Sequence, residues 1–197
     1  MEKIKFLILE FGETNVLNEA QAIRETVERA GQSAVDISNH RCMNEKDILT
    51  VVSTMKPAWI HIISESEKKN LLLKAEKMTA IRINKYDLTR KLQIASPNLC
   101  FLGFNSRLSE LDYKNFSTLF AAIGMEKGYN PIAMRQFAPL FYGNLAGGMR
   151  LGASFRHAFD NVQKEVLFRF GGPYMCFNTD IDPDSFAFLP RENVFMN

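Results

Sequence analysis

Short runs of apolar residues alternate along this chain with segments whose apolar residues recur every three or four positions. The runs Ile4 to Phe11, Trp59 to Ile63 and Leu99 to Phe104 are rich in β-branched and aromatic side chains, as is typical of strands covered on both faces. Residues 16–30 and 45–55 repeat apolar positions with the period of a helix. This alternation predicts a parallel sheet with right-handed crossovers and helices on both faces.

The remaining segments extend this pattern and add a small insertion. Leu71 to Lys74 and Thr79 to Ile83 are two short apolar segments separated by a polar turn, which predicts a β-hairpin. The other expected elements are strands at 33–38, 119–125 and 174–177 and helices at 86–94, 131–146 and 151–166. We therefore expect one domain, residues 1–197, folded as a three-layer α/β/α sandwich with a mostly parallel sheet and a small β-hairpin insertion.

Composition narrows the function classes. Of the 197 residues, 24 are Lys or Arg and 22 are Asp or Glu, and no basic stripe marks a nucleic-acid-binding surface. The three cysteines form no Cys-x-x-Cys pair, which favours a reducing compartment over a disulfide framework or a zinc site. Glu10 interrupts the first apolar run, which is too short for a signal peptide or a membrane span. We expect a cytoplasmic protein without nucleic-acid or membrane partners.

Polar residues follow two of the expected central strands. Ser64, Glu65 and Ser66 come after Ile63, and Asn105 and Ser106 come after Phe104. Ligand and catalytic sites of open parallel sheets form beyond the carboxyl ends of the strands, so these residues are the candidate site. The candidate holds one carboxylate, one amide and three hydroxyls.

Several strings in the same order resemble the CHAT proteases, which are relatives of caspases, separase and gingipain. The family pattern apolar-His-apolar-small-Gly-His-Gly is matched by residues 60–66, and its strand ending Asn-Ala-Cys-acidic-Ser by residues 103–107. The hairpin with its short helix and the last two helices also resemble the family. The resemblance covers most of the chain and implies a caspase-like sheet and a place in prokaryotic signalling or antiviral defence.

The departures from the family pattern imply an inactive member. In the family, the second His of the motif is the general base and the Cys is the nucleophile; Glu65 and Asn105 stand at these positions here. An amide has no attacking lone pair comparable to that of a thiolate, so we expect a pseudoprotease that binds or regulates another protein. One rival is a hydrolase with a repositioned nucleophile, such as Ser106 with Glu65 as base. Another is a structural subunit of a larger complex.

No cofactor or metal is expected. His61 matches the first, structural His of the family motif and is expected to hydrogen-bond within the fold. Asp180, Asp182 and Asp184 resemble the start of a calcium loop, but the sixth position of that loop is Ser185 instead of Gly. They are therefore expected to form a solvated turn.

The last part of the chain carries more apolar side chains than one short strand can bury. Caspase relatives often associate near their last strands, and large exposed apolar patches mark interfaces. We therefore expect an interface with another protein or a second copy. Its candidate residues are Phe170, Tyr174, Phe177, Phe186 and Phe188.

Overall fold

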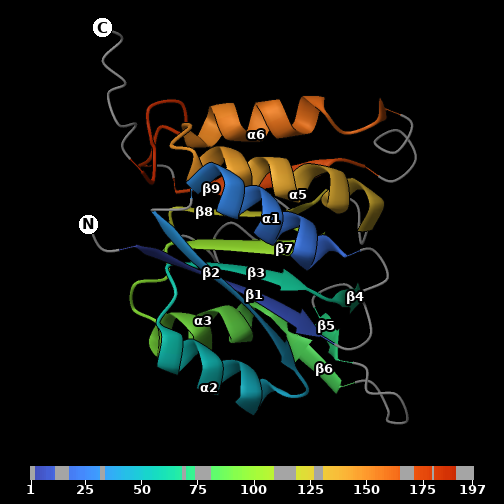
Figure 1. Cartoon of the computed structure of the whole chain (residues 1–197). Coiled ribbons are helices and arrows are strands. Elements are labelled where there is room, and N and C mark those ends of the chain that lie inside the picture. The colour runs from blue at the N-terminus through green and yellow to red at the C-terminus, as the bar shows by residue number, and fades with distance from the viewer. Residues whose placement is uncertain are drawn as a thin grey trace, which may run out of the picture.

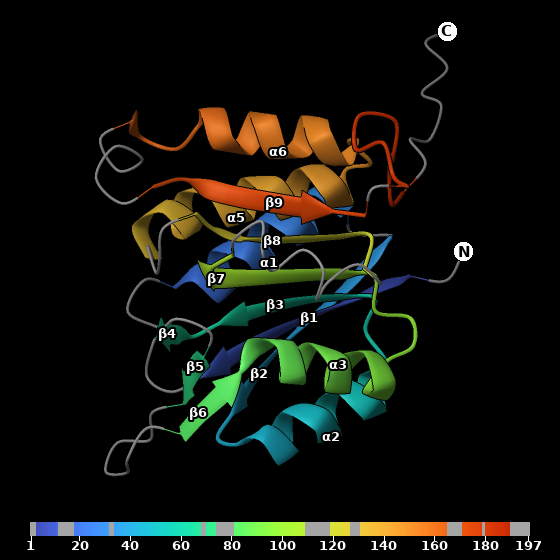
Figure 2. The same cartoon turned by 180° about the vertical axis from the view of Figure 1, so that it is seen from behind.

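The structure is a computed structural model of the whole chain. It describes residues 3–11, 18–31, 34–67, 70–73, 81–108, 119–126, 131–164, 171–178 and 180–189. Phe170, one of the candidate interface residues, lies outside this described part. Figures 1 and 2 show the arrangement of the elements from opposite sides.

A six-stranded sheet with the order β2-β1-β3-β7-β8-β9 forms the centre of the fold. Its first five strands are parallel, and β9 pairs antiparallel with β8 at one edge. The mostly parallel sheet confirms the expected α/β architecture. The bounds of the strands are Ile4–Phe11 for β1, Val35–Cys42 for β2, Trp59–Ile63 for β3, Phe101–Arg107 for β7, Ala121–Met125 for β8 and Pro173–Phe177 for β9.

Helices cover both faces of the sheet and make the three layers of the fold. On one face lie α1 (Glu19–Gly31), α5 (Pro131–Ala146) and α6 (Leu151–Asp160); on the other lie α2 (Glu45–Met55) and α3 (Lys85–Ala95). Because successive side chains of a strand point to opposite faces, each strand contributes to two cores. In β1, for example, Phe6 and Ile8 face α1 and α5, whereas Leu7 and Leu9 face α2 and α3.

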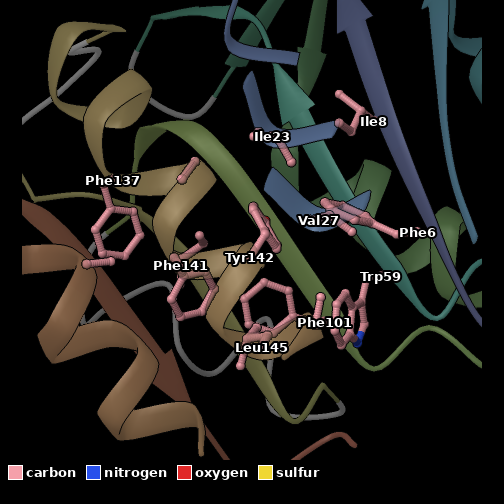
Figure 3. Packing of buried hydrophobic residues seen from close by; sticks show 14 of the residues in the cluster. Phe6, Ile8, Ile23, Val27, Trp59, Phe101, Phe137, Phe141, Tyr142 and Leu145 are labelled. Atoms are coloured by element: carbon pink, nitrogen blue, oxygen red, sulfur yellow. The ribbon is translucent and has the colours of Figure 1, made fainter. Parts of the chain in front are cut away.

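Aromatic rings dominate the core between the sheet and α5 (Figure 3). The ring of Tyr142 lies 4.6 Å from that of Phe6 and 5.9 Å from that of Phe101, and Phe137 stacks on Phe141 at 5.3 Å. All five rings are fully buried. Such pairs contribute about 0.5–1.5 kcal/mol each beyond the area that they bury, so they stabilise the packing of α5 on the sheet.

Local signals set the ends of two helices. The side chain of Asn44 accepts a hydrogen bond from the backbone N–H of Asp47 and caps α2, and Lys56 ends this helix in a left-handed conformation before Pro57. Asn84 caps α3 in the same way. These caps explain why both helices begin close to the residues that the sequence predicts.

The expected hairpin is present and is one strand larger than predicted. β5 (Asn70–Leu73) pairs antiparallel with β6 (Ile81–Asn84), and β4 (Glu65–Glu67) pairs with the other side of β5. Glu65 and Ser66 therefore belong to a strand of this small sheet. They follow β3 in the chain as the sequence indicates, and β5 supplies them with a pairing partner.

Three other elements differ from the sequence prediction. β2 extends to Cys42 instead of ending at residue 38, so His40 and Cys42 lie in a strand that pairs with the end of β1. β7 includes Asn105, Ser106 and Arg107, because Arg107 still pairs with Met125 after a register shift. α6 ends at Asp160 instead of 166, where the N–H groups of residues 161 and 162 turn back to carbonyls three residues earlier.

The segment 180–189, which we call the C-terminal strap, crosses the end of the sheet where β3 and β7 begin. The backbone N–H groups of Leu151 and Gly152, at the start of α6, donate to the carbonyls of Phe186 and Pro183 at 2.8 and 2.7 Å. These carbonyls satisfy N–H groups that a helix start leaves without an internal partner. The strap therefore completes α6. None of the described helices is long and apolar enough to cross a membrane.

Candidate functional site

The carboxyl ends of β3 and β7 bring the two positions of the resembled dyad together. The backbone N–H of Ser64 donates to Oδ1 of Asn105 at 3.0 Å, and the hydroxyl of Ser64 donates to the carbonyl of Glu65 at 2.7 Å. Asn105 is 1% exposed and Ser64 is fully buried, while Glu65 and Ser66 are partly exposed. A short chain of hydrogen bonds thus joins Glu65 to Asn105.

At the carboxyl ends of β3 and β7, the polar side chains hold the backbone in place and are not arranged for catalysis. Oδ1 of Asn105 is occupied by the Ser64 N–H, and its Nδ2 has no hydrogen-bond partner among the described residues. The hydroxyl of Ser106 is also buried and has no such partner. A serine nucleophile needs a base within hydrogen-bond reach, and no described side chain occupies that place beside Ser106.

Three residues before Ser64 in the sequence, His61 of β3 lies in a buried hydrogen-bonded network with two helices, α1 and α5, that cover the same face of the sheet. Its Nε2 is 2.8 Å from Oε1 of Glu19 at the start of α1, and its Nδ1 is 2.9 Å from the hydroxyl of Tyr142 in α5. Glu19 is 5% exposed and the other two residues are fully buried. The expectation that His61 bonds within the fold is therefore met by partners 42 and 81 residues away.

Both hydrogen bonds of His61 can form while Tyr142 keeps its own proton. Burial, and then the charge of Glu19, raise the pKa of Tyr142 well above its usual value, so its hydroxyl keeps the proton and can donate it to Nδ1 of His61. In the tautomer with its proton on Nε2, His61 accepts from Tyr142 and donates to Glu19. No local pattern in the sequence reveals that Glu19 is buried, because its partner His61 lies 42 residues away.

Gly103 provides the space for this network. A Cβ atom at position 103 would lie 2.1 Å from the hydroxyl oxygen of Tyr142 and 2.5 Å from Nδ1 of His61. Both distances are shorter than real carbon contacts allow, and the side chains are held by packing on all sides. The glycine is therefore required by the close approach of α5 to the sheet.

A second carboxyl group lies near the network at the end of β1. Burial raises the pKa of Glu10, Arg41 on the neighbouring strand lowers it, and the charge of Glu19 raises it further. Desolvation is the largest of these effects, so Glu10 ionises with more difficulty than a free glutamate.

The thiols are poorly suited to nucleophilic chemistry. Burial raises the pKa of Cys42 to about 11 and that of Cys100 to about 12. Cys176, in β9, is buried in the core on the face of the sheet that α2 and α3 cover. A reactive cysteine needs a thiolate at neutral pH, which these surroundings oppose.

Across the described part of the chain, no three His, Cys, Asp or Glu residues cluster closely enough to hold a metal ion. No protein-family model and no curated protein matches the sequence. The geometry of the site and of the molecular surface therefore carries the functional argument.

The candidate interface residues separate into two groups in the structure. Phe188 is partly buried, with its ring 5.1 Å from Trp59 and 5.8 Å from Phe101, and Phe186 packs on Phe188 at 4.9 Å. These two rings close the end of the core. Phe177 is 37% exposed, and Tyr174 is partly buried against the opposite core. Sequence reasoning missed Phe120, which is 40% exposed beside Phe186.

β9 presents an open edge. Glu126 N–H donates to the carbonyl of Gly172, and Asn178 N–H donates to that of Phe120, which identifies the hydrogen-bonded positions of the ladder with β8. Those positions alternate, so the backbone N–H and C=O groups of Met175 and Phe177 point away from β8. No described residue pairs with these groups. The third outward position is Pro173, which lacks an N–H and suits an edge.

Proposed function

We propose that this protein is a catalytically inactive, caspase-like relative of the CHAT proteases that acts by binding another protein chain. The order of elements supports the relationship, since the small antiparallel sheet and α3 stand between β3 and β7, and two helices follow β8. The two positions that the resemblance equates with the base and nucleophile also lie together at one edge of the sheet.

Loss of catalysis is supported by the surroundings of Asn105, at the nucleophile position, and of its neighbour Ser106. Asn105 cannot form an acyl intermediate, and its amide oxygen already holds the backbone of Ser64. Ser106, the candidate for a repositioned nucleophile, is buried without a base beside it. In this proposal, the carboxyl ends of β3 and β7 have a structural role and no longer a catalytic one.

Protein binding is carried by one observation, the unpaired outward groups of Met175 and Phe177 on β9. A strand edge of this kind accepts an added strand through main-chain hydrogen bonds, and nearby pockets or side chains select the sequence. The exposed ring of Phe177 adds apolar contact area at the end of the same strand. We place this activity in the cytoplasm, in a prokaryotic signalling or defence system.

A backbone-blocking substitution tests the binding proposal. Met175→Pro removes one outward N–H without touching the ladder to β8, whereas Met175→Val keeps that N–H and serves as the control. A phage library of random extended peptides would be selected on the wild-type protein. We expect the selected peptides to bind wild type and Met175→Val at least tenfold more tightly than Met175→Pro. Equal binding to all three proteins contradicts the proposal.

Activity-based probes test the proposal that the protein is catalytically inactive. Fluorophosphonate and iodoacetamide probes are expected to label the folded protein no faster than its unfolded form. Rapid labelling of Ser106 or of any cysteine at neutral pH would establish a nucleophile and overturn the assignment as inactive.

A further inference from the structure

Acidic side chains follow the carboxyl end of β9. Asp180, Asp182 and Asp184 are exposed and follow Phe177 within a few residues. Their backbone is held in tight turns, with the N–H of Asp180 donating to Oδ1 of Asn178 at 2.9 Å and the N–H of Asp184 donating to Oδ1 of Asp182 at 3.0 Å. The charges are therefore fixed at this end of the strand.

Two of these charges have no ion-pair partner among the described residues. Asp184 pairs with Arg156 at 2.7 Å. Hydrogen bonds from the backbone of Asp184 and the side chain of Ser185 lower the pKa of Asp182, and Arg150 contributes least to this effect. Asp182 is thus ionised at neutral pH, and Asp180 adds a second exposed acidic side chain at the same end of the strand. Two negative charges remain available to a ligand.

Exposed aromatic rings adjoin the same end of the edge. The backbone bond from Asn178 to Phe120 places Phe120 beside the last residue of β9, and Phe120 and Phe177 are 40% and 37% exposed. The open edge, the two rings and the two carboxylates therefore form one continuous surface, which we call the β9 surface.

We propose that the β9 surface binds an extended segment of a different protein, with apolar side chains over Phe120 and Phe177 and a basic side chain beside Asp180 and Asp182. This inference rests on the proposed function and specifies its partner. A basic residue matches the two free charges, and a paired strand brings it within the range over which surface charges act.

A second copy of the chain meets this requirement poorly. Self-pairing would lay β9 of one molecule along β9 of the other, and residues 171–178, Gly-Gly-Pro-Tyr-Met-Cys-Phe-Asn, contain no charged side chain. A copy paired in parallel would bring its own aspartates beside Asp180 and Asp182, and like charges brought together weaken association. An antiparallel copy, whose Arg169 precedes this segment in the sequence, is distinguished by the light-scattering test below.

Two matched peptides test the partner. Each has eight residues of alternating valine and threonine; one carries two lysines at its end, the other two glutamates, and both are made with the charges at either terminus. Fluorescence polarisation measures their binding, and hydrogen exchange follows the amides of Met175 and Phe177. We expect the lysine peptides to bind at least tenfold more tightly than the glutamate peptides and to slow exchange at both amides.

Substitutions test whether Asp180 and Asp182 cause the preference for lysine peptides. Asp180→Asn with Asp182→Asn keeps similar side chains and should weaken lysine-peptide binding about tenfold, and 0.5 M salt should weaken binding to wild type similarly. Asp36→Asn, in the opposite edge strand β2, is the control and should change neither lysine-peptide binding nor its dependence on salt. Met175→Pro should abolish the exchange protection.

The outcomes separate this inference from the proposed function. If glutamate peptides bind as tightly as lysine peptides, with protection of Met175 and Phe177, the basic partner is wrong and the binding edge stands. If light scattering shows a dimer that Met175→Pro disperses, the occupant is a second copy and the inference is overturned. If no peptide binds and no exchange changes, both proposals fail.

Discussion

The side-chain oxygen of Asn105 accepts the backbone N–H of Ser64 at 3.0 Å, across the gap between β7 and β3 where the paired ladder ends at Ile62 and Phe104. The amide thus replaces a ladder hydrogen bond at the point where the two strands separate. This role requires a side chain that carries an acceptor oxygen to the Ser64 N–H, which gives a first prediction.

Asn105→Ala should destabilise the protein by about 1–3 kcal/mol, because a buried N–H loses its acceptor. Urea unfolding monitored by circular dichroism measures the change. Asn98→Ala, at an exposed position in the turn before β7, is the control and should change stability by less than about 0.5 kcal/mol. A comparable loss in both variants would show that the Asn105 bond is unimportant.

The Gly103 contacts predict a coupled pair of substitutions. Gly103→Ala should cost about 1–3 kcal/mol by overpacking, and Tyr142→Phe about 1–3 kcal/mol by leaving Nδ1 of His61 without its donor. Together they should cost about 1 kcal/mol less than their sum, since removing the hydroxyl removes the 2.1 Å contact. Strict additivity of the two free energies would contradict the close approach. Gly147→Ala, where a Cβ has only ordinary contacts, controls for backbone effects.

The burial of Glu10 predicts a pH-dependent gain from its removal. Its pKa is raised in the folded state, so the folded protein holds this proton more tightly than the unfolded chain does. Stability from this group is present below the unfolded pKa of about 4.3 and is lost as the pH rises through the folded pKa. Glu10→Gln should therefore stabilise the protein at pH 7 by about 0.5 kcal/mol after solvent screening, and not at pH 3.5. A gain of equal size at both pH values would exclude this explanation.

The pKa of about 12 at Cys100 predicts slow alkylation. An unfolded thiol has a pKa near 8.5, so at pH 8 the folded thiol should react with iodoacetamide roughly a thousandfold more slowly. The rate should rise about tenfold for each pH unit up to pH 10. Mass spectrometry of the labelled peptide measures the rate in native protein and in urea. Fast native labelling at pH 7 would show an ionised thiol.

The two groups of aromatic residues near β9 should respond differently to truncation. Phe188→Ala should cost about 2–3 kcal/mol, because this ring packs on Trp59 and Phe101, whereas Phe177→Ala should remain within about 0.5 kcal/mol. Thermal unfolding of the two variants distinguishes these values. Equal losses would place Phe177 in the core and remove it from the β9 surface.

Much of the fold follows from local sequence patterns. β1 and β3 have the predicted bounds, since their apolar runs end at polar or proline residues, and Asn44 starts α2 as its capping chemistry requires. The meeting of Ser64 with Asn105 also follows from the sequence, because carboxyl ends of adjacent parallel strands share one edge. Local pattern and parallel topology are sufficient for these features.

Other features depend on contacts that no local pattern reveals. Glu19, His61 and Tyr142 are far apart in the chain, and each fits an ordinary role by itself: a polar first-turn residue, a strand residue and a member of an apolar helix stripe. Phe186 and Phe188 have the composition of an exposed patch, yet the strap folds them onto Trp59 and Phe101. The antiparallel direction of β9 likewise depends on the long return from α6.

The two carbonyls that the strap lends to the start of α6 affect how the protein is made. During synthesis, α1, α5 and the parallel strands leave the ribosome before Pro183 and Phe186, so the first turn of α6 must wait for the last part of the chain. A nascent chain stalled before residue 183 would therefore expose the rings of Trp59 and Phe101 beside an unfinished helix. We expect such an intermediate to bind chaperones and chains truncated before residue 183 to aggregate.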